Sequence, residues 1–196
     1  MGQPAEKLRQ ATYADLEAVP SHQVAEIING MLYAMPRPAP PHANASSVLG
    51  IEIGGPFQRG KGGPGGWWIL DEPELHFPTP LAKEGKDVVV PDLAGWPRQR
   101  MPKLPGTAHF SLAPDWICEV LSPSTERLDR EEKMPIYARE GVRHAWLVDP
   151  IARTLEVYTL GDRRRWGAAG LHRDNALVRL APFDVIELDL GALWLD

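Results

Sequence analysis

A glutamate stands in the middle of an apolar segment. Glu119 belongs to the run 115–121, DWICEVL, whose length and apolar content are typical of a buried strand. Side chains alternate along a strand, so Glu119 shares one face with Ile117 and Leu121, and neither face is polar enough to be solvated. Burying a carboxylate costs free energy unless a cation or a proton accompanies it. Glu119 is therefore a candidate metal ligand or, alternatively, the partner of a nearby arginine.

A second acid follows another apolar run. Asp92 comes after 88–91, VVVP, where the proline cannot donate to a β-ladder and favours the end or the edge of a strand. Magnesium prefers oxygen ligands and keeps several waters, so Asp92 and Glu119 together suit a magnesium site that takes substrate phosphates. The other interpretation of Asp92 is that it begins a turn.

A lysine follows these acids in the chain. If a helix ran unbroken from Asp129, Pro135 would lie in its interior at a cost of about 3 kcal/mol, whereas a start near 131 or 132 places the proline in the tolerant first turn. We therefore expect Lys133 near the N-terminus of a helix, where the helix dipole opposes a cation. Carboxylates nearby explain such a lysine; the alternative is a solvated lysine offset by the glutamates beside it.

The elements that must position these residues alternate between helices and strands. Caps, helical spacing of apolar residues and closing Pro or Gly predict helices at 12–19, 42–53 and about 132–140. Apolar runs between turn residues predict strands at 24–28, 31–35, 87–91, 115–121, 144–148, 155–160, 177–180 and 185–190, and one strand or a broken pair at 67–70 and 75–77. Asn29-Gly30 joins the first two strands as a hairpin. The class is mixed α/β or α+β: a mixed sheet flanked by helices, an N-terminal β-hairpin and a β-rich C-terminal tail.

Length and composition limit the kind of protein. With 196 residues and 43% hydrophobic content, we expect one domain spanning residues 1–196. No apolar run approaches about 18 residues, and MGQPAEKLRQ at the N-terminus has no apolar segment after its charges, so we expect neither a membrane span nor a signal peptide, and a cytoplasmic protein. The single cysteine, Cys118, argues against a disulfide framework and against a structural zinc site of the Cys/His type.

The net charge of −5 argues against a general nucleic-acid coat protein, because phosphate binding draws its affinity from clustered Lys and Arg. Local clusters do occur. They are Arg98, Arg100 and Lys103; Arg127, Arg130 and Lys133; and Arg163, Arg164 and Arg165. We interpret each cluster as a solvated loop, with a local basic patch as the alternative.

Four segments, taken in order, resemble a known family. They are VAEIINGMLYAMP, VVVPDLAGW, DWICEVLSPST and EKMPIYAREGVRHAWLVDP, with His42 between the first two. This ordered set resembles the Uma-two (Uma2) family of restriction endonuclease-like proteins over about residues 12–160. The family is assigned to the PD-(D/E)XK nuclease superfamily, whose members arrange acids and a lysine around magnesium. The resemblance implies a restriction endonuclease-like core.

The resemblance also implies a role for each matching residue. Asp92 stands as the PD aspartate, Glu119 as the second acid and Glu26, in EIING, as an additional acid, so these three are the expected ligands of Mg²⁺ or Mn²⁺. Leu121 occupies the place, two residues after the second acid, where the superfamily has a lysine; Lys133 supplies that charge from the following helix. Asp92, Glu119 and Lys133 are the expected catalytic residues.

Several neighbouring features receive structural interpretations. Tyr137 lies on the same helical face as the lysine, where it either orients the lysine or packs under it, and we expect packing. His42 either approaches the site or has a capping or structural role, and we expect the latter. Ser122 and Ser124 lack a GxSxG elbow, and GKGGPGG lacks the GxxxxGK[ST] spacing, so we expect a turn and a flexible loop.

The carboxylates and the resemblance together predict a magnesium-dependent endonuclease that hydrolyses nucleic-acid phosphodiester bonds, with DNA as the expected substrate. A rival interpretation is a protein that keeps the nuclease fold without cleaving and acts in binding or regulation. Another is a metal-dependent hydrolase of a different substrate, since a fold does not fix a function. Enzymes that cut two strands often work as dimers, so a homodimer is a further expectation.

Overall fold

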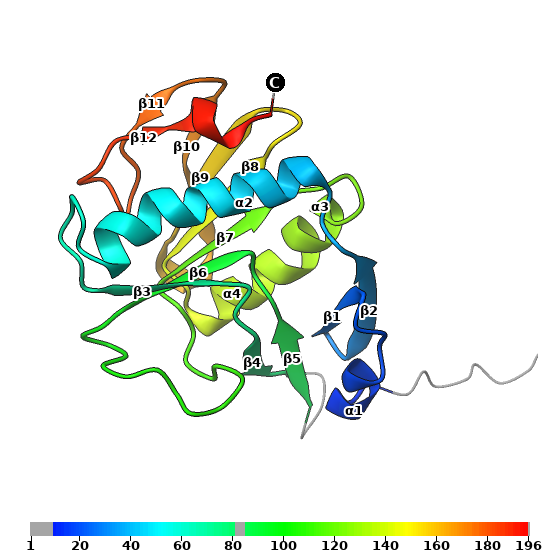
Figure 1. Cartoon of the computed structure of the whole chain (residues 1–196). Helices are drawn as coiled ribbons and strands as arrows, with labels where there is room; N and C mark the ends of the chain where they lie inside the picture. Colours follow the sequence, from blue (N-terminus) through cyan, green and yellow to red (C-terminus); the bar gives the residue numbers. More distant parts are fainter. Residues whose placement is uncertain (1–9, 81–84, 196) are drawn as a thin grey trace, which may run out of the picture.

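The computed structural model of the protein describes residues 10–80 and 85–195. The expectation that the chain has no signal peptide concerned residues 1–10, and residues 1–9 lie outside the described part. Within it, strands form a six-stranded sheet, a four-stranded sheet and a two-stranded ribbon (Figure 1). None of the helices in the described ranges is long and apolar enough to cross a membrane.

The six-stranded sheet has mixed strand directions. In spatial order it comprises β10 (Trp166–Arg173), β9 (Thr154–Leu160), β8 (His144–Asp149), β7 (Trp116–Val120), β6 (Leu93–Pro97) and β3 (Trp67–Asp71). β7 and β8 are parallel, and the other neighbouring strands are antiparallel. The parallel pair requires a crossover connection, which the helices between residues 126 and 140 provide.

The remaining strands and the helices complete the fold. The four-stranded sheet comprises β2 (Met31–Pro36), β1 (Gln23–Ile28), β5 (Lys86–Val89) and β4 (Leu75–Pro78), and the ribbon comprises β11 (Leu177–Val178) and β12 (Leu188–Asp189). The α-helices are α1 (Tyr13–Glu17), α2 (Pro40–Ile53), α3 (Glu126–Leu128) and α4 (Met134–Glu140). The π-helices are η1 (Gly54–Gln58) and η2 (Asp129–Lys133), and the 3-10 helices are η3 (Asp162–Arg164) and η4 (Leu190–Leu193).

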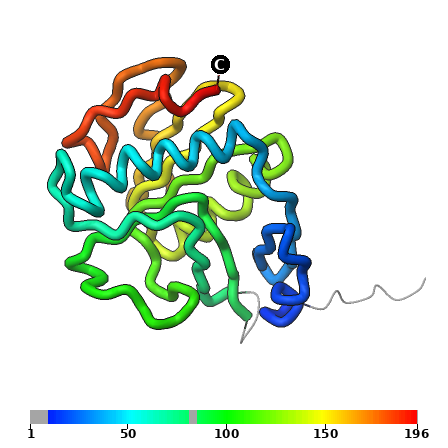
Figure 2. Tube along the Cα trace, viewed as in Figure 1, coloured from blue at the N-terminus to red at the C-terminus, as the bar shows by residue number. Residues whose placement is uncertain are grey.

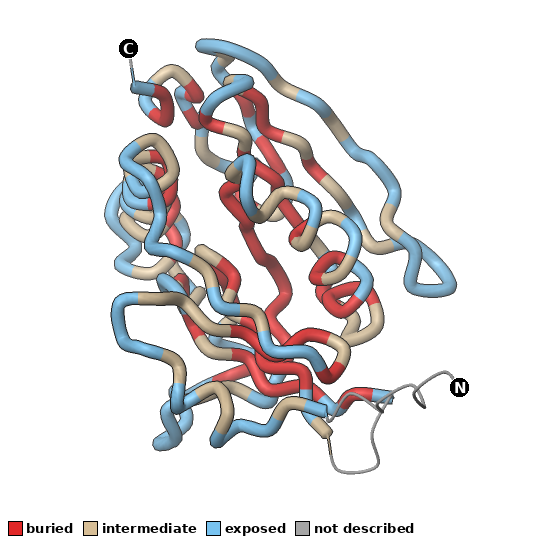
Figure 3. The backbone as a smooth tube through the Cα atoms, turned by 90° about the vertical axis from the view of Figure 1, so that its right-hand side faces the viewer, coloured by how far each residue is buried: buried red, intermediate tan, exposed pale blue. Residues whose placement is uncertain are grey.

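The six-stranded sheet has a buried cluster on each face. On one face, Leu49 of α2 and Phe183 of the C-terminal segment share a buried cluster with Trp146 of β8. Figures 1 and 2 show α2 running across the six-stranded sheet. On the other, Ile136 of α4 shares a cluster with Leu147 of β8 and with residues of the four-stranded sheet. The buried positions therefore run through the middle of the molecule (Figure 3).

β7 lies between these two clusters, and all five of its residues are buried. Trp116, Cys118 and Val120 belong to the cluster that includes α2, whereas Ile117 belongs to the cluster that includes α4. The alternation expected from the sequence is confirmed. Glu119 consequently projects toward α4.

The N-terminal hairpin is also confirmed. β1 and β2 pair along their whole length, and Asn29 and Gly30 join them with φ angles of 52° and 79°. Both angles are positive, as a type I′ turn requires, which explains the Asn-Gly pair at this point.

The helix that carries Lys133 begins earlier than expected. Helical structure begins at Glu126 and continues through η2 into α4, so the expectation that Lys133 lies near a helix N-terminus is wrong. In η2, the Met134 N–H donates to the Asp129 carbonyl five residues earlier. This wider turn accommodates Pro135, whose ring would clash with a carbonyl in a regular α-helical turn.

Two strands were missed, and the C-terminal strands are shorter than expected. β6 contains a glycine and ends at a proline, which are weak strand formers, and β10 contains two glycines. Gly95 of β6 is nevertheless required by packing, because a Cβ there would lie 3.1 Å from Ile69 Cδ1 and 3.2 Å from Trp116 Cε3. Tertiary packing thus overrides local propensity in β6.

A half-buried ion pair links the four-stranded sheet to α4. Asp87 of β5 is fully buried, accepts a hydrogen bond from the Asn29 N–H at 2.7 Å and pairs with Arg139 Nη2 at 2.8 Å. Removing the guanidinium leaves this carboxylate short of a charged partner. We expect Arg139→Met to lower the free energy of unfolding by about 1.5 to 3 kcal/mol in urea denaturation, the range for a charged hydrogen bond.

Arg143→Met is the matched control for this measurement. Arg143 is 75% exposed and lies 3.9 Å from Asp115, so its loss should cost less than about 1 kcal/mol. Equal losses in the two variants would contradict the assignment of Asp87 and Arg139 as a structural link.

Candidate active site

The four residues singled out in the sequence meet at one cavity. Glu26 comes from β1, Asp92 from the segment between β5 and β6, Glu119 from β7 and Lys133 from η2. All four line a cavity of about 300 Å³ between the hairpin, the start of α2 and the end of β7. The fold therefore brings together residues that are far apart in the sequence.

The ammonium group of Lys133 lies at the centre of this group. Its Nζ lies 2.9 Å from Glu119 Oε1 and 3.1 Å from Glu26 Oε1, and it donates to the Val90 carbonyl at 3.1 Å. A fourth oxygen, Asp129 Oδ1, lies 3.5 Å away. The Lys133 side chain is 4% exposed. Burial alone lowers the pKa of Lys133, but Glu119 and Glu26 outweigh it, so the pKa is raised well above its usual value.

Glu119 is held by two donors. Lys133 Nζ donates to its Oε2 at 3.0 Å, and the Tyr137 hydroxyl donates to its Oε1 at 2.5 Å. Burial raises the pKa of the Glu119 carboxyl well above its usual value, although Lys133 acts in the opposite direction. Tyr137 packs in the core, as expected, and it also orients Glu119, which the packing interpretation left out.

Asp92 is fixed from two sides. Its Oδ2 accepts a hydrogen bond from the Val120 N–H at 2.7 Å, and its Oδ1 lies 3.3 Å from His42 Nε2. Burial lowers the pKa of His42, but the hydrogen bond and charge of Asp92 prevail, so the net shift is upward. The N-cap of α2 is Ala39, so His42 does not cap this helix. The structure places His42 in the lining of the cavity, which was the alternative expectation.

Glu26 is anchored by the backbone. Its Oε1 accepts a hydrogen bond from the Val90 N–H at 2.6 Å and also faces Lys133. The same peptide region that precedes Asp92 therefore contacts both Glu26, through the N–H of Val90, and Lys133, through its carbonyl. This arrangement couples the hairpin to the segment that carries Asp92.

Asp129 is a site residue that the sequence analysis missed. It lies four residues before Lys133, lines the same cavity and is 4% exposed. Burial raises the pKa of its carboxyl to about 6, with Lys133 opposing this shift and Glu26 adding to it. Three acids beside an arginine and a lysine are ordinary composition for an exposed helix, so only the structure reveals that Asp129 faces the cavity.

The rim of the cavity is also acidic. Glu72 lies on it, and burial followed by the charges of Asp71 and Asp92 raises the pKa of Glu72. Arg37 is the exposed basic residue on this rim. Ser122 forms side-chain hydrogen bonds with Ser124 and Thr125, as expected of a turn, and all three residues line the cavity.

Two of the basic clusters seen in the sequence, 98–103 and 127–133, form mostly ion pairs or ring contacts. Arg130 pairs with Glu126 at 2.8 Å and with Glu156 at 2.6 Å, and Arg127 pairs with Glu131 at 2.8 Å. In the first cluster, Arg100 pairs with Asp115 at 2.5 Å, and Arg98 lies over the Trp68 ring at 4.0 Å. These pairs reduce the basic surface that the two clusters present.

The donor set of the cavity fits a hard divalent cation in its chemistry. Glu26, Asp92, Glu119 and Asp129 offer carboxylate oxygens, the ligands that magnesium prefers, in one cavity. The Lys133 ammonium supplies one positive charge to this group. A divalent cation would complete its neutralisation, provided that Lys133 yields part of its present contacts.

Comparison with known families identifies the chain's relatives. The sequence model of the Uma2 family, described as "Putative restriction endonuclease", matches residues 10–191. The chain belongs to the Uma2 family. The resemblance of four short segments thus extends over nearly the whole chain, well beyond residues 12–160.

A solved structure supports the fold. The chain is similar to a crystal structure titled as a putative nuclease belonging to DUF820 from Anabaena variabilis ATCC 29413. The TM-score is 0.70 and the identity 21%, over 93% of this chain and 97% of the other. This Uma2 protein therefore shares the mixed α+β fold of that structure. No curated protein matches the sequence.

The raised pKa of Asp129 makes stability depend on pH. Because the folded-state pKa, about 6, exceeds the usual 3.8, the folded state binds this proton more tightly than the unfolded state does. The resulting stabilisation is present below 3.8 and is lost as the pH rises through about 6. Relative to Asp129→Asn, we expect the wild type to lose about 3 kcal/mol between about pH 4 and 6, at 1.36 kcal/mol per pKa unit.

Urea denaturation at several pH values, with EDTA present, measures this difference. A difference between the two proteins that stays constant over this pH range would contradict the buried placement of Asp129.

Tyr137→Phe tests the hydroxyl that holds Glu119. The variant keeps the ring and removes the donor, so we expect a loss of about 1.5 to 3 kcal/mol in the free energy of unfolding. Tyr158→Phe is the matched control, because the Tyr158 hydroxyl donates to Glu156, which is nearer the surface and also bound by Arg130. We expect a smaller loss there. No measurable loss in Tyr137→Phe would show that Tyr137 acts through ring packing alone.

Proposed function

We propose that this Uma2 protein is a magnesium-dependent endonuclease that hydrolyses phosphodiester bonds of DNA at the cavity around Lys133. The proposal rests on one observation above all: Glu26, Asp92, Glu119 and Asp129 face one cavity together with a buried lysine. Membership of a family described as "Putative restriction endonuclease" supports the choice of nucleic acid as substrate.

Charge supports the requirement for a metal. Phosphate groups are repelled by an acidic cavity, and the basic residues that line this one are Lys133, Arg37 and the titratable His42. A divalent cation reverses the local charge and lets a phosphate approach carboxylates. Asp92, Glu119 and Glu26 are the residues that would hold Mg²⁺, or Mn²⁺ in its place.

Bound Mg²⁺ would supply Lewis-acid polarisation of the phosphate and a lower pKa for water. The chain's own residues would do the positioning. Lys133 Nζ would donate to an oxygen of the scissile phosphate and stabilise the charge that grows there. Tyr137 would keep Glu119 oriented, and His42 would do the same for Asp92. Hydrolysis adds a hydroxyl group to phosphorus and a proton to the departing oxygen.

Cleavage of plasmid and oligonucleotide DNA in Mg²⁺ or EDTA tests the proposal. We expect Asp92→Asn, Glu119→Gln and Lys133→Met each to lower the rate by about 10²- to 10³-fold, the usual effect of removing an electrostatic group from a site. Glu187→Gln is the matched control, since Glu187 is 52% exposed and outside the cavity. Its rate should equal that of the wild type.

Magnesium binding is measured separately by calorimetry on the same variants. Cleavage that persists in Glu119→Gln would remove the assignment of the site. Magnesium binding without cleavage of DNA or RNA, single- or double-stranded, would favour the rival interpretation of a nuclease fold that binds and does not cut.

A further inference from the structure

A second set of metal-type donors lies at β4, outside the carboxylate cavity. Glu74 directly precedes β4, His76 belongs to it, and His109 comes from the loop 98–115 between β6 and β7. His76 and His109 line a cavity that shares no lining residue with the one around Lys133. Among the described residues, these three side chains form the group of possible metal ligands whose ligand atoms all lie within 4.8 Å of one another.

The backbone builds this cluster. Leu75 and Phe110 form a parallel bridge, in which the His76 N–H donates to the Phe110 carbonyl at 2.9 Å and the Phe110 N–H donates to the Glu74 carbonyl at 2.9 Å. Leu75 belongs to the core cluster beneath, and the partly buried Phe110 packs against that cluster. Because neighbours along an extended segment alternate, Glu74, His76 and His109 all project to the opposite side. Two hydrogen-bonded segments thus hold the three donors together.

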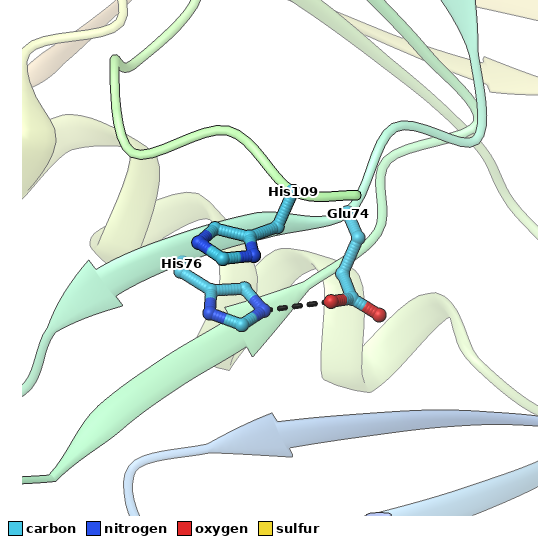
Figure 4. A group of neighbouring side chains, drawn as sticks. All are labelled: Glu74, His76 and His109. Atoms are coloured by element: carbon cyan, nitrogen blue, oxygen red, sulfur yellow. Dashed lines mark hydrogen bonds and ion pairs between the residues drawn. The ribbon is translucent and has the colours of Figure 1, made fainter. Parts of the chain in front are cut away.

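The side chains are in contact (Figure 4). Glu74 Oε1 lies 2.7 Å from His76 Nε2, and the His76 and His109 rings stack with centroids 3.9 Å apart and an interplanar angle of 9°. His76 is buried, whereas Glu74 and His109 are half-buried. Burial lowers the pKa of His76, which favours the neutral ring that a metal requires.

α1 supplies an outer partner for the cluster. The Tyr13 hydroxyl donates to Glu74 Oε1 at 2.9 Å, and the Tyr13 ring meets the His76 ring edge-on at 5.1 Å. Hydrogen bonds of this kind orient metal-ligating carboxylates. Lys86 also lines this cavity, so its ammonium is the nearby charge that opposes a cation.

We propose that Glu74, His76 and His109 bind a divalent transition-metal ion such as Zn²⁺, separately from the magnesium site. Two imidazoles and one carboxylate are ligands of zinc and its neighbours in the first transition row, whereas magnesium prefers oxygen alone. Three protein ligands leave a further position for water, as in open zinc sites. The bound ion would fasten the loop 98–115 to β4.

Binding requires a local rearrangement. A metal lies in the plane of each ring that ligates it, and two parallel stacked rings offer no such common point. The ring of His109, half-buried on a loop, must therefore turn out of the stack, while His76 stays fixed in β4. Ligand atoms around one zinc ion lie about 3.3 Å apart, given bonds of about 2.0 Å. The distance of 2.7 Å between Glu74 Oε1 and His76 Nε2 would therefore widen by about 0.6 Å.

Calorimetric titration of the whole chain with Zn²⁺, in excess Mg²⁺, tests the proposal. We expect one ion per chain. His109→Phe keeps a ring that can stack on His76 but has no nitrogen to bind the ion. Its zinc affinity should fall by more than about tenfold, because removing only a residue that hydrogen-bonds to a metal ligand already costs at least that much. Glu74→Gln should behave likewise. Thermal melting in EDTA verifies that each variant is folded.

Two controls complete the experiment. His22→Phe removes an exposed histidine outside the cluster, and Glu119→Gln alters the carboxylate cavity; both should bind zinc as the wild type does. Unchanged affinity in His109→Phe would overturn the proposal, as would a zinc stoichiometry of zero. Loss of zinc binding in Glu119→Gln alone would place the ion in the carboxylate cavity and overturn it too. None of these results depends on cleavage of DNA.

Discussion

The contact between the buried Lys133 ammonium and the carboxylates around it is the interaction on which this site depends. A buried ion pair loses the solvation of both partners, and only several good contacts recover that loss. Lys133 has them: two oxygens of Glu119, one of Glu26 and the Val90 carbonyl, all at 2.9 to 3.1 Å. These partners come from β7, the N-terminal hairpin and the segment before Asp92. The lysine therefore ties both sheets to the crossover helix.

The π-helical turn explains how a crossover helix presents that lysine. A π-turn widens the helix locally, and such turns are frequent at functional sites. In this chain, η2 leads Pro135 into α4 and turns both Asp129 and Lys133 inward, 3.5 Å apart. A regular helix beginning at Glu131 would have left Asp129 outside the helix. The π-helical turn thus contributes Asp129 to the acids around the lysine, whereas Glu26 and Glu119 come from β1 and β7.

The sequence predicted the fold class, the hairpin and the burial of Glu119, because periodicity and turn chemistry are local signals. It did not predict Asp129 or the contacts of Tyr137 and His42, because each depends on how segments distant in the chain pack. The Glu74, His76 and His109 cluster escaped for the same reason: its histidines lie on a strand and a remote loop, with none of the short spacing typical of zinc motifs. Asp92 was found from its apolar run, but its bond to the Val120 N–H required the fold.

The electrostatics of the carboxylate cavity limit what it can bind. Burial raises the pKa of Glu119, and it raises that of Asp129 to about 6, so protons and cations compete for the same oxygens. One ammonium cannot neutralise four carboxylates, and the remaining charge must be met by protons or by a cation from solution. As the pH rises above about 6, the proton on Asp129 is lost and the demand for a cation grows. Burial of these carboxylates therefore makes the binding of a divalent cation release protons at this cavity.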